Sequence, residues 1–565
     1  MSMIHLLPAL LLGMISSRVA TVLPPEFNVR DYGATGDGKT LDTPAINKAI
    51  EAASAAGGGV VRLPAGTYLS FSIHLRSRVT LQLEAGCRLL AATPAEGFGA
   101  YDAAEPNEWG DKFLYQDFGH SHWHNSLLWG ENLEDVTILG PGLIHGEGLR
   151  RAVELGRREG DHSFGPNNTP PPGSPPPALA QPVPGLGNKA IALKNCRNVV
   201  IRDLGILLGG HFALLATGVD GLTVENVRLD TNRDGLDIDS CRNVRIANCQ
   251  VNAPNDDAIV LKSSFALGEV RACENITIVG CKVSGYDAGT VFDGTFGRTL
   301  ERAPDRDGPT GRIKIGTESN GAFRKITIAD CVFERSRGLA LETVDGGIIE
   351  DVTVTNLTMR EVTTAPIFLR LGNRARGPAG TPVGGIRRVR ISGVVARDVD
   401  ARHPILLAGL RGHPIEDVTL SDIQIFSRGG LTMDHVARQP AELVSPFFLR
   451  GGEPGTTGPR EPQAVPEREK GYPEPSMFGL LPASAVYARH VRNFTLTNCT
   501  VTFAEPDSRT RVVLDDVAGV TLRNLAVPRP AEGPAFVLRG VRDFEISESP
   551  GVPDAKHENA EAREF

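Results

Sequence analysis

Short stretches in which apolar and polar residues alternate recur along the chain from about residue 195 onward. Each contains apolar residues separated by polar ones and ends in Asn, Asp or Gly, as in Asn243-Val-Arg-Ile-Ala-Asn and Asp351-Val-Thr-Val-Thr-Asn. Alternation with a period of two is typical of a short β-strand with one buried face. No helical period lies between the stretches, so the pattern predicts strands joined by turns.

The spacing of the repeats indicates the architecture. One apolar position of each stretch serves as a marker, and these positions are Ile201, Val224, Ile246, Ile278, Ile328, Val354, Ile391, Leu420, Leu496, Leu522 and Ile546. The shortest steps between markers are 22–26 residues, the length of one solenoid coil, whereas a propeller blade needs about 40. Longer steps are coils that carry loop insertions. We therefore expect an all-β fold, a right-handed parallel β-helix.

The N-terminal part fits the same plan. Asp42, Thr43 and Pro44 precede apolar residues at helical spacing and predict a capped amphipathic helix that ends at the glycines from residue 57. Strand-like sequence follows from Val60. Because an open solenoid end exposes strand edges and apolar core, we expect this helix to cover the first coil.

The chain is expected to form one large domain with a short segment at each end. Residues 1–22 include an apolar stretch, Leu6 to Ile15, with the length of a signal-peptide core and too short to span a bilayer. This predicts a secreted or periplasmic protein without a membrane span. Residues 23–550 are the β-helix domain, and the polar tail 551–565 is expected to fray. Loop insertions, which we expect to wall a cleft, lie at about 98–130, 150–190, 295–310 and 427–485.

Composition narrows the classes of protein. The 565 residues are 41% hydrophobic with a net charge of −8, which excludes wholesale disorder and gives no signature of a nucleic-acid partner. Eight cysteines are too few for a disulfide framework in a chain of this length. Seven of them fall into two registers relative to the strand markers. We expect reduced cysteines stacked in the core of a monomer.

Two polar segments on adjacent coils carry the most informative acidic residues. Asn232-Arg-Asp-Gly-Leu-Asp-Ile-Asp is followed by Asn255-Asp-Asp-Ala-Ile-Val-Leu-Lys. Asp234 and Asp256 are 22 residues apart, the same step as between Val224 and Ile246. We therefore expect them to stack at one position on adjacent coils. With Asp257 they would place three carboxylates within about 5–10 Å on one outward face.

Three acids in one place suit general acid–base catalysis. Like charges at short range raise the pKa of at least one carboxyl group, so that a proton donor can lie beside a base. Inverting glycoside hydrolysis needs such a pair with room for a water. Two alternatives stay open at this point: Asn and Asp also favour turns, above all at Asp237 and Asp239, and an oxygen-only cluster suits calcium.

These motifs resemble those of the pectin-degrading polygalacturonases and rhamnogalacturonases of glycoside hydrolase family 28. The likeness begins at Phe27-Asn-Val-Arg-Asp-Tyr-Gly-Ala-Thr-Gly-Asp-Gly, an opening shared with other β-helical sugar enzymes, and covers about residues 26 to 530. The family's Asn-Thr-Asp-Gly-x-Asp motif stands here as Asn232-Arg233-Asp234-Gly235-Leu236-Asp237. Its Asp-Asp motif stands as Asp256-Asp257, one coil later.

The resemblance implies an inverting O-glycosyl hydrolase of the polygalacturonase type. Its expected partner is a pectin-type polysaccharide, with rhamnogalacturonan among the candidates. Asp256 is implied as the general acid, and Asp234 and Asp257 as the base pair that activates water. Further residues of the two segments are expected to bind substrate, namely Asn232, Asp237 and Lys262. Neither a metal ion nor a cofactor is expected.

Two motifs of the family are missing. The Gly-His-Gly motif should follow one coil later, but residues 284–290 contain no histidine. The Arg-x-Lys motif should come in the next coil, where the chain has Ala340-Leu-Glu342. Arg312 and Lys314 spell the same phrase one coil earlier, and we expect them to face outward and bind a uronate carboxylate. The alternatives are that they are merely solvated strand positions and that the sugar at the cleavage point is neutral. His211 and Glu342 are further candidates for the cleft, although a turn position is the alternative for His211.

Two other functions fit the same acids. A β-helical lyase would use them as calcium ligands, but it needs a basic catalytic residue that no motif clearly supplies. A non-catalytic carbohydrate-binding or adhesive β-helix would explain the altered motifs. A binding surface has no need of three clustered acids, so we expect a glycosidase. The lost Arg-x-Lys motif argues against simple homogalacturonan as its substrate.

Overall fold

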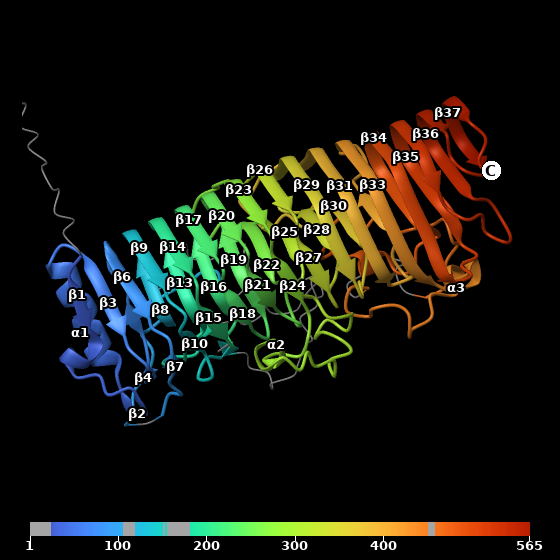
Figure 1. Cartoon of the computed structure of the whole chain (residues 1–565). Helices are drawn as coiled ribbons and strands as arrows, with labels where there is room; N and C mark the ends of the chain where they lie inside the picture. Colours follow the sequence, from blue (N-terminus) through green and yellow to red (C-terminus); the bar gives the residue numbers. More distant parts are fainter. Residues whose placement is uncertain (1–23, 96, 106–118, 151–152, 155–180, 450–457) are drawn as a thin grey trace, which may run out of the picture.

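The computed structural model describes residues 24–95, 97–105, 119–150, 153–154, 181–449 and 458–565. The predicted signal segment 1–22 and most of the insertion at 150–190 lie outside these residues. The described chain forms a long parallel β-helix with few helices (Figure 1). Equivalent strands of successive coils pair with one another, which produces three parallel ladders along the molecule.

The bounds of the strands follow the three ladders. The first ladder contains β1 (Glu26–Asn28), β3 (Gly59–Leu63), β6 (Val79–Leu83), β9 (Glu134–Leu139), β14 (Arg197–Arg202), β17 (Asp220–Glu225), β20 (Arg242–Ala247), β23 (Cys273–Val279), β26 (Phe323–Ala329), β29 (Ile348–Arg360), β31 (Gly385–Val399), β33 (Ile415–Gly429), β34 (Ala483–Glu505), β35 (Thr510–Ala526) and β36 (Phe536–Ser547). The second contains β2 (Asp37–Leu41), β4 (Gly66–Ser70), β7 (Cys87–Ala91), β10 (Leu143–His145), β15 (Gly205–Leu207), β18 (Arg228–Asp230), β21 (Gln250–Asn252), β24 (Lys282–Ser284) and β27 (Val332–Glu334), and then joins the long strands from β29 onward. The third contains β5 (Ile73–His74), β8 (Ser126–Glu131), β13 (Lys189–Lys194), β16 (Phe212–Thr217), β19 (Asp234–Asp239), β22 (Ile259–Ser263), β25 (Ile313–Ser319), β28 (Leu339–Thr343), β30 (Ile367–Leu371) and β32 (Ile405–Ala408), and continues into the first residues of β34, β35 and β36.

The pairing register of the first ladder confirms the repeat that the sequence predicts. Every marker from Ile201 to Ile546 is the direct partner of the next marker, across insertions as long as the one between Leu420 and Leu496. The ladder also extends upstream, because Ile138 pairs with Ile201. Since a slip of one residue would turn the apolar side chains outward, burial holds this register.

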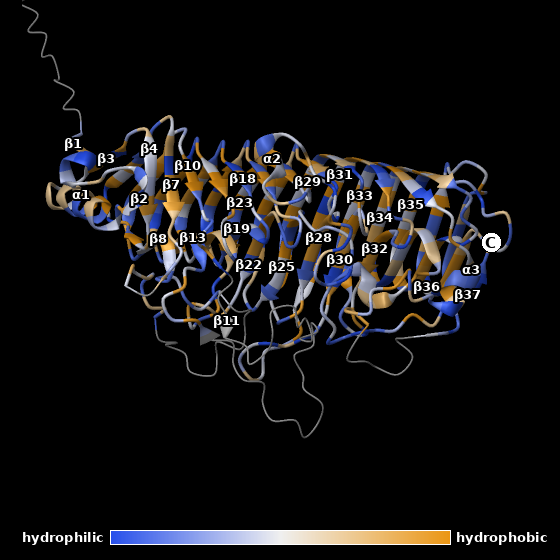
Figure 2. Cartoon of the chain, turned by 90° about the horizontal axis from the view of Figure 1, so that it is seen from below, coloured by the Kyte–Doolittle hydropathy of each residue, from blue (hydrophilic) through white to orange (hydrophobic). Residues whose placement is uncertain are grey.

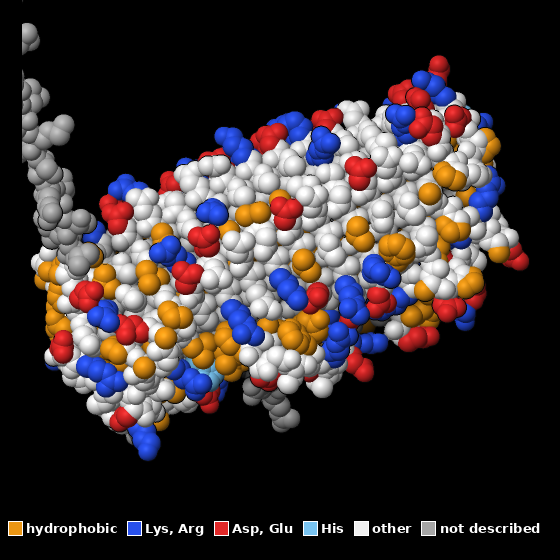
Figure 3. All heavy atoms as spheres, viewed as in Figure 1, with side chains coloured by type: hydrophobic (Ala, Val, Ile, Leu, Met, Phe, Trp, Pro, Cys, Tyr) orange, Lys and Arg blue, Asp and Glu red, His pale blue; other side chains and the backbone are white. Residues whose placement is uncertain are grey.

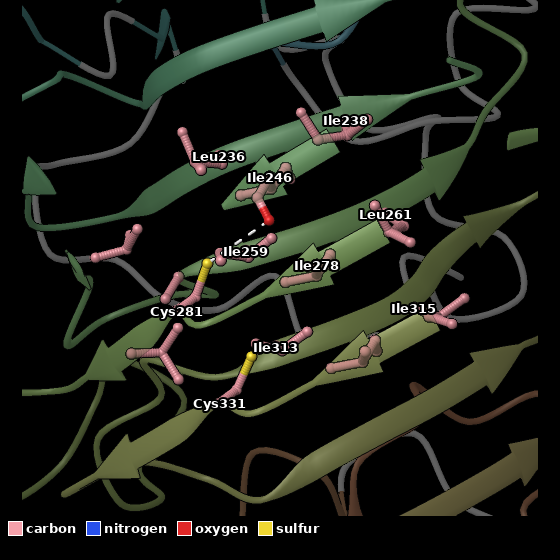
Figure 4. Packing of buried hydrophobic residues seen from close by; sticks show 14 of the residues in the cluster. Leu236, Ile238, Ile246, Ile259, Leu261, Ile278, Cys281, Ile313, Ile315 and Cys331 are labelled. Carbon is pink, nitrogen blue, oxygen red and sulfur yellow. Dashed lines mark hydrogen bonds between the residues drawn. The ribbon is translucent and has the colours of Figure 1, made fainter. Parts of the chain in front are cut away.

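Inward-facing apolar side chains fill the solenoid from one end to the other. Hydrophobic residues follow the strands in Figure 2, and Figure 4 shows Ile246, Ile278 and Cys281 packed among residues of the third ladder. All eight cysteines are buried and free of disulfides, which confirms the prediction of reduced core cysteines. Among the described residues, no helix has the length and apolar character needed to cross a membrane.

Both ends of the solenoid are covered. Helix α1 (Thr43–Ala55) buries its apolar face at the first coils, as predicted. Asp42 does not cap it, however, because its carboxylate accepts the backbone N–H groups of Thr35 and Gly36 instead. At the other end the expectation of a frayed tail is wrong. The polar residues form β37 (Ala555–Glu564), which pairs antiparallel with β36, and the terminal Phe565 stacks on Phe536.

Removal of residues 551–565 tests this C-terminal cover. The truncation leaves β36 with an unpaired edge and uncovers Phe536, so we expect a lower melting temperature and concentration-dependent self-association. Thermal unfolding and light scattering measure the two effects. Lys556→Ala, at a side chain that is 78% exposed, is the control and should change neither. A truncated chain that melts like the full chain and stays monodisperse would show that β37 adds nothing.

Candidate active site

The conspicuous charged groups lie on the outward side of the third ladder, where β19, β22 and β25 are neighbours. Asp230 of β18 pairs with Asn252 of β21, an offset of 22 residues, but Leu236 of β19 pairs with Ile259 of β22, an offset of 23. The turn before β22 therefore holds one extra residue. The Gly235 N–H donates to the carbonyl oxygen of Asp257 at 3.0 Å, so Asp257 lies beside Asp234. The prediction that Asp256 occupies that position is wrong by this one residue.

The three acids still converge. One carboxylate oxygen from each of Asp234, Asp256 and Asp257 lies within 4.8 Å of the other two. Asp234 and Asp257 are 4% and 1% exposed, whereas the Asp256 side chain keeps 25% of its surface open. The extra residue of the turn thus leaves Asp256 as the most accessible carboxylate of the cluster.

Asp257 is held as a buried carboxylate. Arg312 Nε donates to its Oδ1 at 2.9 Å, and Lys314 Nζ forms an ion pair with its Oδ2. Burial alone would raise the pKa of Asp257, but the charges of Lys314 and Arg312 hold it well below its usual value. Both oxygen atoms of Asp257 therefore face a cation, and the group stays ionised at neutral pH.

Asp234 has the opposite environment. Burial and the nearby charge of Asp256 raise the pKa of Asp234 well above its usual value. Its Oδ1 has no hydrogen-bond partner in the described part of the chain. This environment favours the protonated carboxyl group, although the resemblance implies Asp234 as a base.

Asp256 is bound by a residue that the family motif does not have. Arg233 Nη2 donates to Asp256 Oδ2 at 2.6 Å, and the backbone N–H of Asp257 donates to Oδ1 at 3.1 Å. The Arg233 side chain is 23% exposed, so the ion pair meets solvent. The family's Thr stands where this chain has Arg233. Sequence reasoning quoted this substitution without recognising its effect on Asp256.

Asp237 and Lys262, two further residues of the predicted set, lie on the same strands, β19 and β22. Lys262 Nζ lies 3.4 Å from Asp237 and 3.1 Å from Glu318. His120, from the insertion at 98–130, places Nε2 3.1 Å from Lys262 Nζ. Burial raises the pKa of Asp237 against the opposing charges of Lys262 and His120. Sequence reasoning missed His120 and Glu318, since both reach the group only through the fold.

Several predicted substrate-binding residues do not face solvent. Arg312, Lys314 and Glu342 are at most 3% exposed, because Arg312 and Lys314 hold Asp257 and Glu342 lies under Arg312 at 3.8 Å. Lys314 pairs in register with Ala340. The sequence Arg312-Ile-Lys314 therefore lies one coil before residues 340–342, where the family's Arg-x-Lys motif is expected. The prediction that it binds a uronate is not supported. His211 stacks on Phe212 and is 4% exposed. Asn232 is exposed at the turn, where its Oδ1 accepts from Asn255.

The described part of the insertion at 427–485 packs over the third ladder beyond the acids. Glu474 accepts two hydrogen bonds from Arg312, at 3.1 and 2.8 Å, and pairs with Arg337 at 3.2 Å. Met477 and Phe478 pack on outward apolar residues of the ladder, including Phe368. No motif marks Glu474, and its role follows only from the position of the loop.

The three acids are also the set of His, Cys, Asp and Glu side chains, among those described, whose oxygens converge closely enough for a cation. Two features weigh against a cation there. Arg312 and Lys314 already neutralise Asp257, and Arg233 already neutralises Asp256. A cation site of hard oxygen ligands needs these oxygens free.

Two family models match the chain. One is described as "Rhamnogalacturonase A/epimerase, pectate lyase-like" and matches residues 26–104. The other is described as "Right handed beta helix region" and matches residues 185–303, which agrees with the predicted handedness. The second match includes both segments that carry the three acids.

Curated relatives and solved structures show the same likeness. A probable polygalacturonase of Vitis vinifera is 26% identical over 412 residues, which cover 69% of this chain and 71% of that protein. An exo-poly-alpha-D-galacturonosidase of Dickeya chrysanthemi is 32% identical over 134 residues, covering 24% of this chain and 21% of that protein. The structure of the family 28 exopolygalacturonase of Yersinia enterocolitica aligns with a TM-score of 0.59 at 18% identity, over 88% of this chain and 78% of that one. At this identity the structural likeness shows the fold alone.

Glu342 offers a test of the site's electrostatics. Burial raises the pKa of Glu342 to about 8, and the charges of Glu474 and Asp257 add to this rise against the opposing charges of Arg312 and Lys314. The unfolded chain ionises this residue near pH 4.3, so its contribution to stability is present below that pH and is lost as pH rises toward 8. Glu342→Gln cannot ionise and therefore removes this pH-dependent loss of stability. We expect its melting temperature to exceed that of the wild type by roughly 2–4 °C at pH 7.5 and to equal it at pH 4.5.

Thermal unfolding across this pH range measures the difference. Glu532→Gln, in an exposed loop, is the matched control and should show none. Equal melting temperatures of the Glu342 variant and the wild type at pH 7.5 would contradict the protonated assignment.

Proposed function

We propose that this chain, a distant relative of the polygalacturonases of glycoside hydrolase family 28, hydrolyses glycosidic bonds of a pectin-type polysaccharide by inversion. The observation that carries the proposal is the convergence of three acids in different electrostatic environments. Asp257 is ionised beside two cations, Asp234 favours its proton, and Asp256 is the accessible one. One proton among three carboxylates is what acid–base cleavage of a glycosidic bond requires.

The proposed roles follow accessibility and charge. When substrate is bound, Asp256 carries the one proton of the cluster and Asp234 is ionised, and Asp256 gives this proton to the glycosidic oxygen as the bond to the anomeric carbon breaks. Water attacks that carbon from the opposite side and loses its proton to Asp234, while ionised Asp257 stabilises the positive charge that develops on the sugar ring. The roles of Asp256 and Asp234 are those that the resemblance implies, whereas for Asp257 the resemblance implies a share in activating the water.

Inversion is supported by the state of Asp257. The nearest oxygens of the three acids lie within 4.8 Å, which is shorter than the separation of roughly 6.5–9.5 Å usual for the carboxyl groups of inverting enzymes. A retaining mechanism, however, needs an ionised oxygen that can attack the sugar. Asp257 is 1% exposed and presents both oxygens to cations, so water is the better nucleophile.

Asp256→Asn and Asp234→Asn test the assignment. Each removes a proton-transfer group while keeping its shape, so the rate should fall by about two to four orders of magnitude. Melting temperatures should stay near the wild-type value, since neither change leaves a buried cation unpaired. Reducing-end release from polygalacturonate and rhamnogalacturonan measures the rate, and proton NMR of the first product identifies the anomer. Near-normal turnover by Asp256→Asn, or a retained anomer, would overturn the roles.

Asp257→Asn should behave differently. It leaves Arg312 and Lys314 buried without their shared partner, which costs stability as well as activity. We expect a clear drop in melting temperature in addition to the loss of rate. A variant as stable as Asp256→Asn would show that the ion pairs with Asp257 do not form.

Chelation separates hydrolysis from a calcium-dependent lyase. Protons and water suffice for the proposed mechanism, so EDTA should leave the rate unchanged and no unsaturated product absorbing in the ultraviolet should form. Strong inhibition that calcium reverses, together with such a product, would favour the lyase. Binding of the polysaccharide without any product would favour a carbohydrate-binding function.

A further inference from the structure

The cations around the three acids differ in side-chain exposure and in the carboxylates with which they pair. Arg312 bridges Asp257 and Glu474, and Lys314 pairs with Asp257, both at 2–3% side-chain exposure. Lys262 is 7% exposed and pairs with Glu318. A substrate carboxylate could reach these groups only by leaving another buried acid without its charge partner, which is costly.

Arg233 lies at the accessible edge of the cluster. Its side chain is 23% exposed, and its partner Asp256 is 25% exposed. An ion pair that solvent reaches is weaker than one that is fully buried, so a second carboxylate can compete for the guanidinium. Charges of both signs are interspersed on the face of the molecule that Figure 3 shows. Of Arg233, Arg312 and Lys314, which pair with the three acids, Arg233 has the most exposed side chain.

The hydrogen bonds of Asp256 conflict with its proposed role. Oδ2 accepts from Arg233 and Oδ1 accepts from the backbone of Asp257. A carboxylate that only accepts hydrogen bonds has no proton for a leaving group. The neighbouring Asp234 is the acid whose surroundings favour a proton, and one of its oxygens lies within 4.8 Å of Asp256.

We propose that a carboxylate of the substrate takes Arg233 from Asp256, and that this exchange allows the proton of Asp234 to pass to Asp256. This proposal rests on the proposed hydrolytic function. The transfer leaves Asp234 as a carboxylate and Asp256 as the acid. Asp256 then gives the proton to the glycosidic oxygen as the C–O bond breaks, and the attacking water gives one proton to Asp234. The enzyme returns to its starting protonation, and one water has been consumed.

The exchange makes Arg233 a specificity-determining residue. A neutral sugar cannot compete for the guanidinium, so Arg233 stays on Asp256 and the acid is not formed. A sugar with a free carboxylate next to the scissile bond binds Arg233 and forms the acid in the same step. The charge of the substrate thus affects the chemical step as well as binding.

Arg233→Thr, which restores the residue of the family motif, is the central test. The substrates are acidic oligomers that the wild type hydrolyses and the same oligomers with their carboxylates methyl-esterified. We expect the wild type to prefer the acidic form by about 100-fold or more in kcat/KM. In Arg233→Thr the preference should fall to within about fivefold, because the acid then forms without a substrate carboxylate, so that hydrolysis of the ester rises, while the acidic form loses its contact with Arg233. Arg233→Lys keeps the charge and should retain most of the preference.

Two controls keep the outcomes distinct. Arg245→Thr removes an arginine that is 55% exposed and paired with Glu225 on the first ladder, and it should change neither substrate. Circular dichroism and melting curves identify any variant that misfolds, in which case Arg233→Lys and Arg233→Gln decide between charge and structure. An undiminished preference in folded Arg233→Thr, with the wild type active, would overturn the role of Arg233 alone. A wild type that hydrolyses no such oligomer would overturn the proposed function itself.

Discussion

Coil-to-coil backbone pairing, with apolar side chains turned inward, is the constraint on which the rest of the structure depends. The strands of each coil pair with the equivalent strands of the neighbouring coils, so the position of an outward side chain on a strand is set by the register of the coil before it. The inward stack from Ile201 to Ile546 holds that register even where long loops leave and rejoin the strands. A single extra residue in one turn is therefore enough to change which acid lies beside Asp234.

Burial of charge is the second determinant of the site. The loops that pack over the third ladder bring Glu474 and His120 onto a face that would otherwise meet solvent. Once covered, each charge must find a partner, and the partners decide the protonation states. Asp257 has two cations and remains ionised, whereas burial and the charge of Asp256 raise the pKa of Asp234 and favour its protonated form. Three identical carboxyl groups thereby acquire three different chemical characters.

The departures from the family pattern are related through this network. The chain lacks the usual Arg-x-Lys at Ala340-Leu-Glu342, and its own Arg312 and Lys314 are taken up by Asp257. Arg233, in the place of a threonine, adds a cation at the accessible side of the same acids. Compared with the family motifs, two positive charges lie one coil earlier and a third lies on the accessible side of the acids. The proposed dependence on an acidic substrate follows from where that charge now lies.

The sequence by itself determined the solenoid, its register and the two segments that hold the acids. Those features follow from period-two burial and from spacing along the chain, which are local properties. It did not determine that Asp257 rather than Asp256 lies beside Asp234, because marker spacing measures the first ladder and the extra residue lies in a turn before the third. Nor did it show that Arg312, Lys314 and Glu342 are buried. Arg312 donates to Glu474, 162 residues away in the chain, and only the tertiary fold brings that loop over the acids.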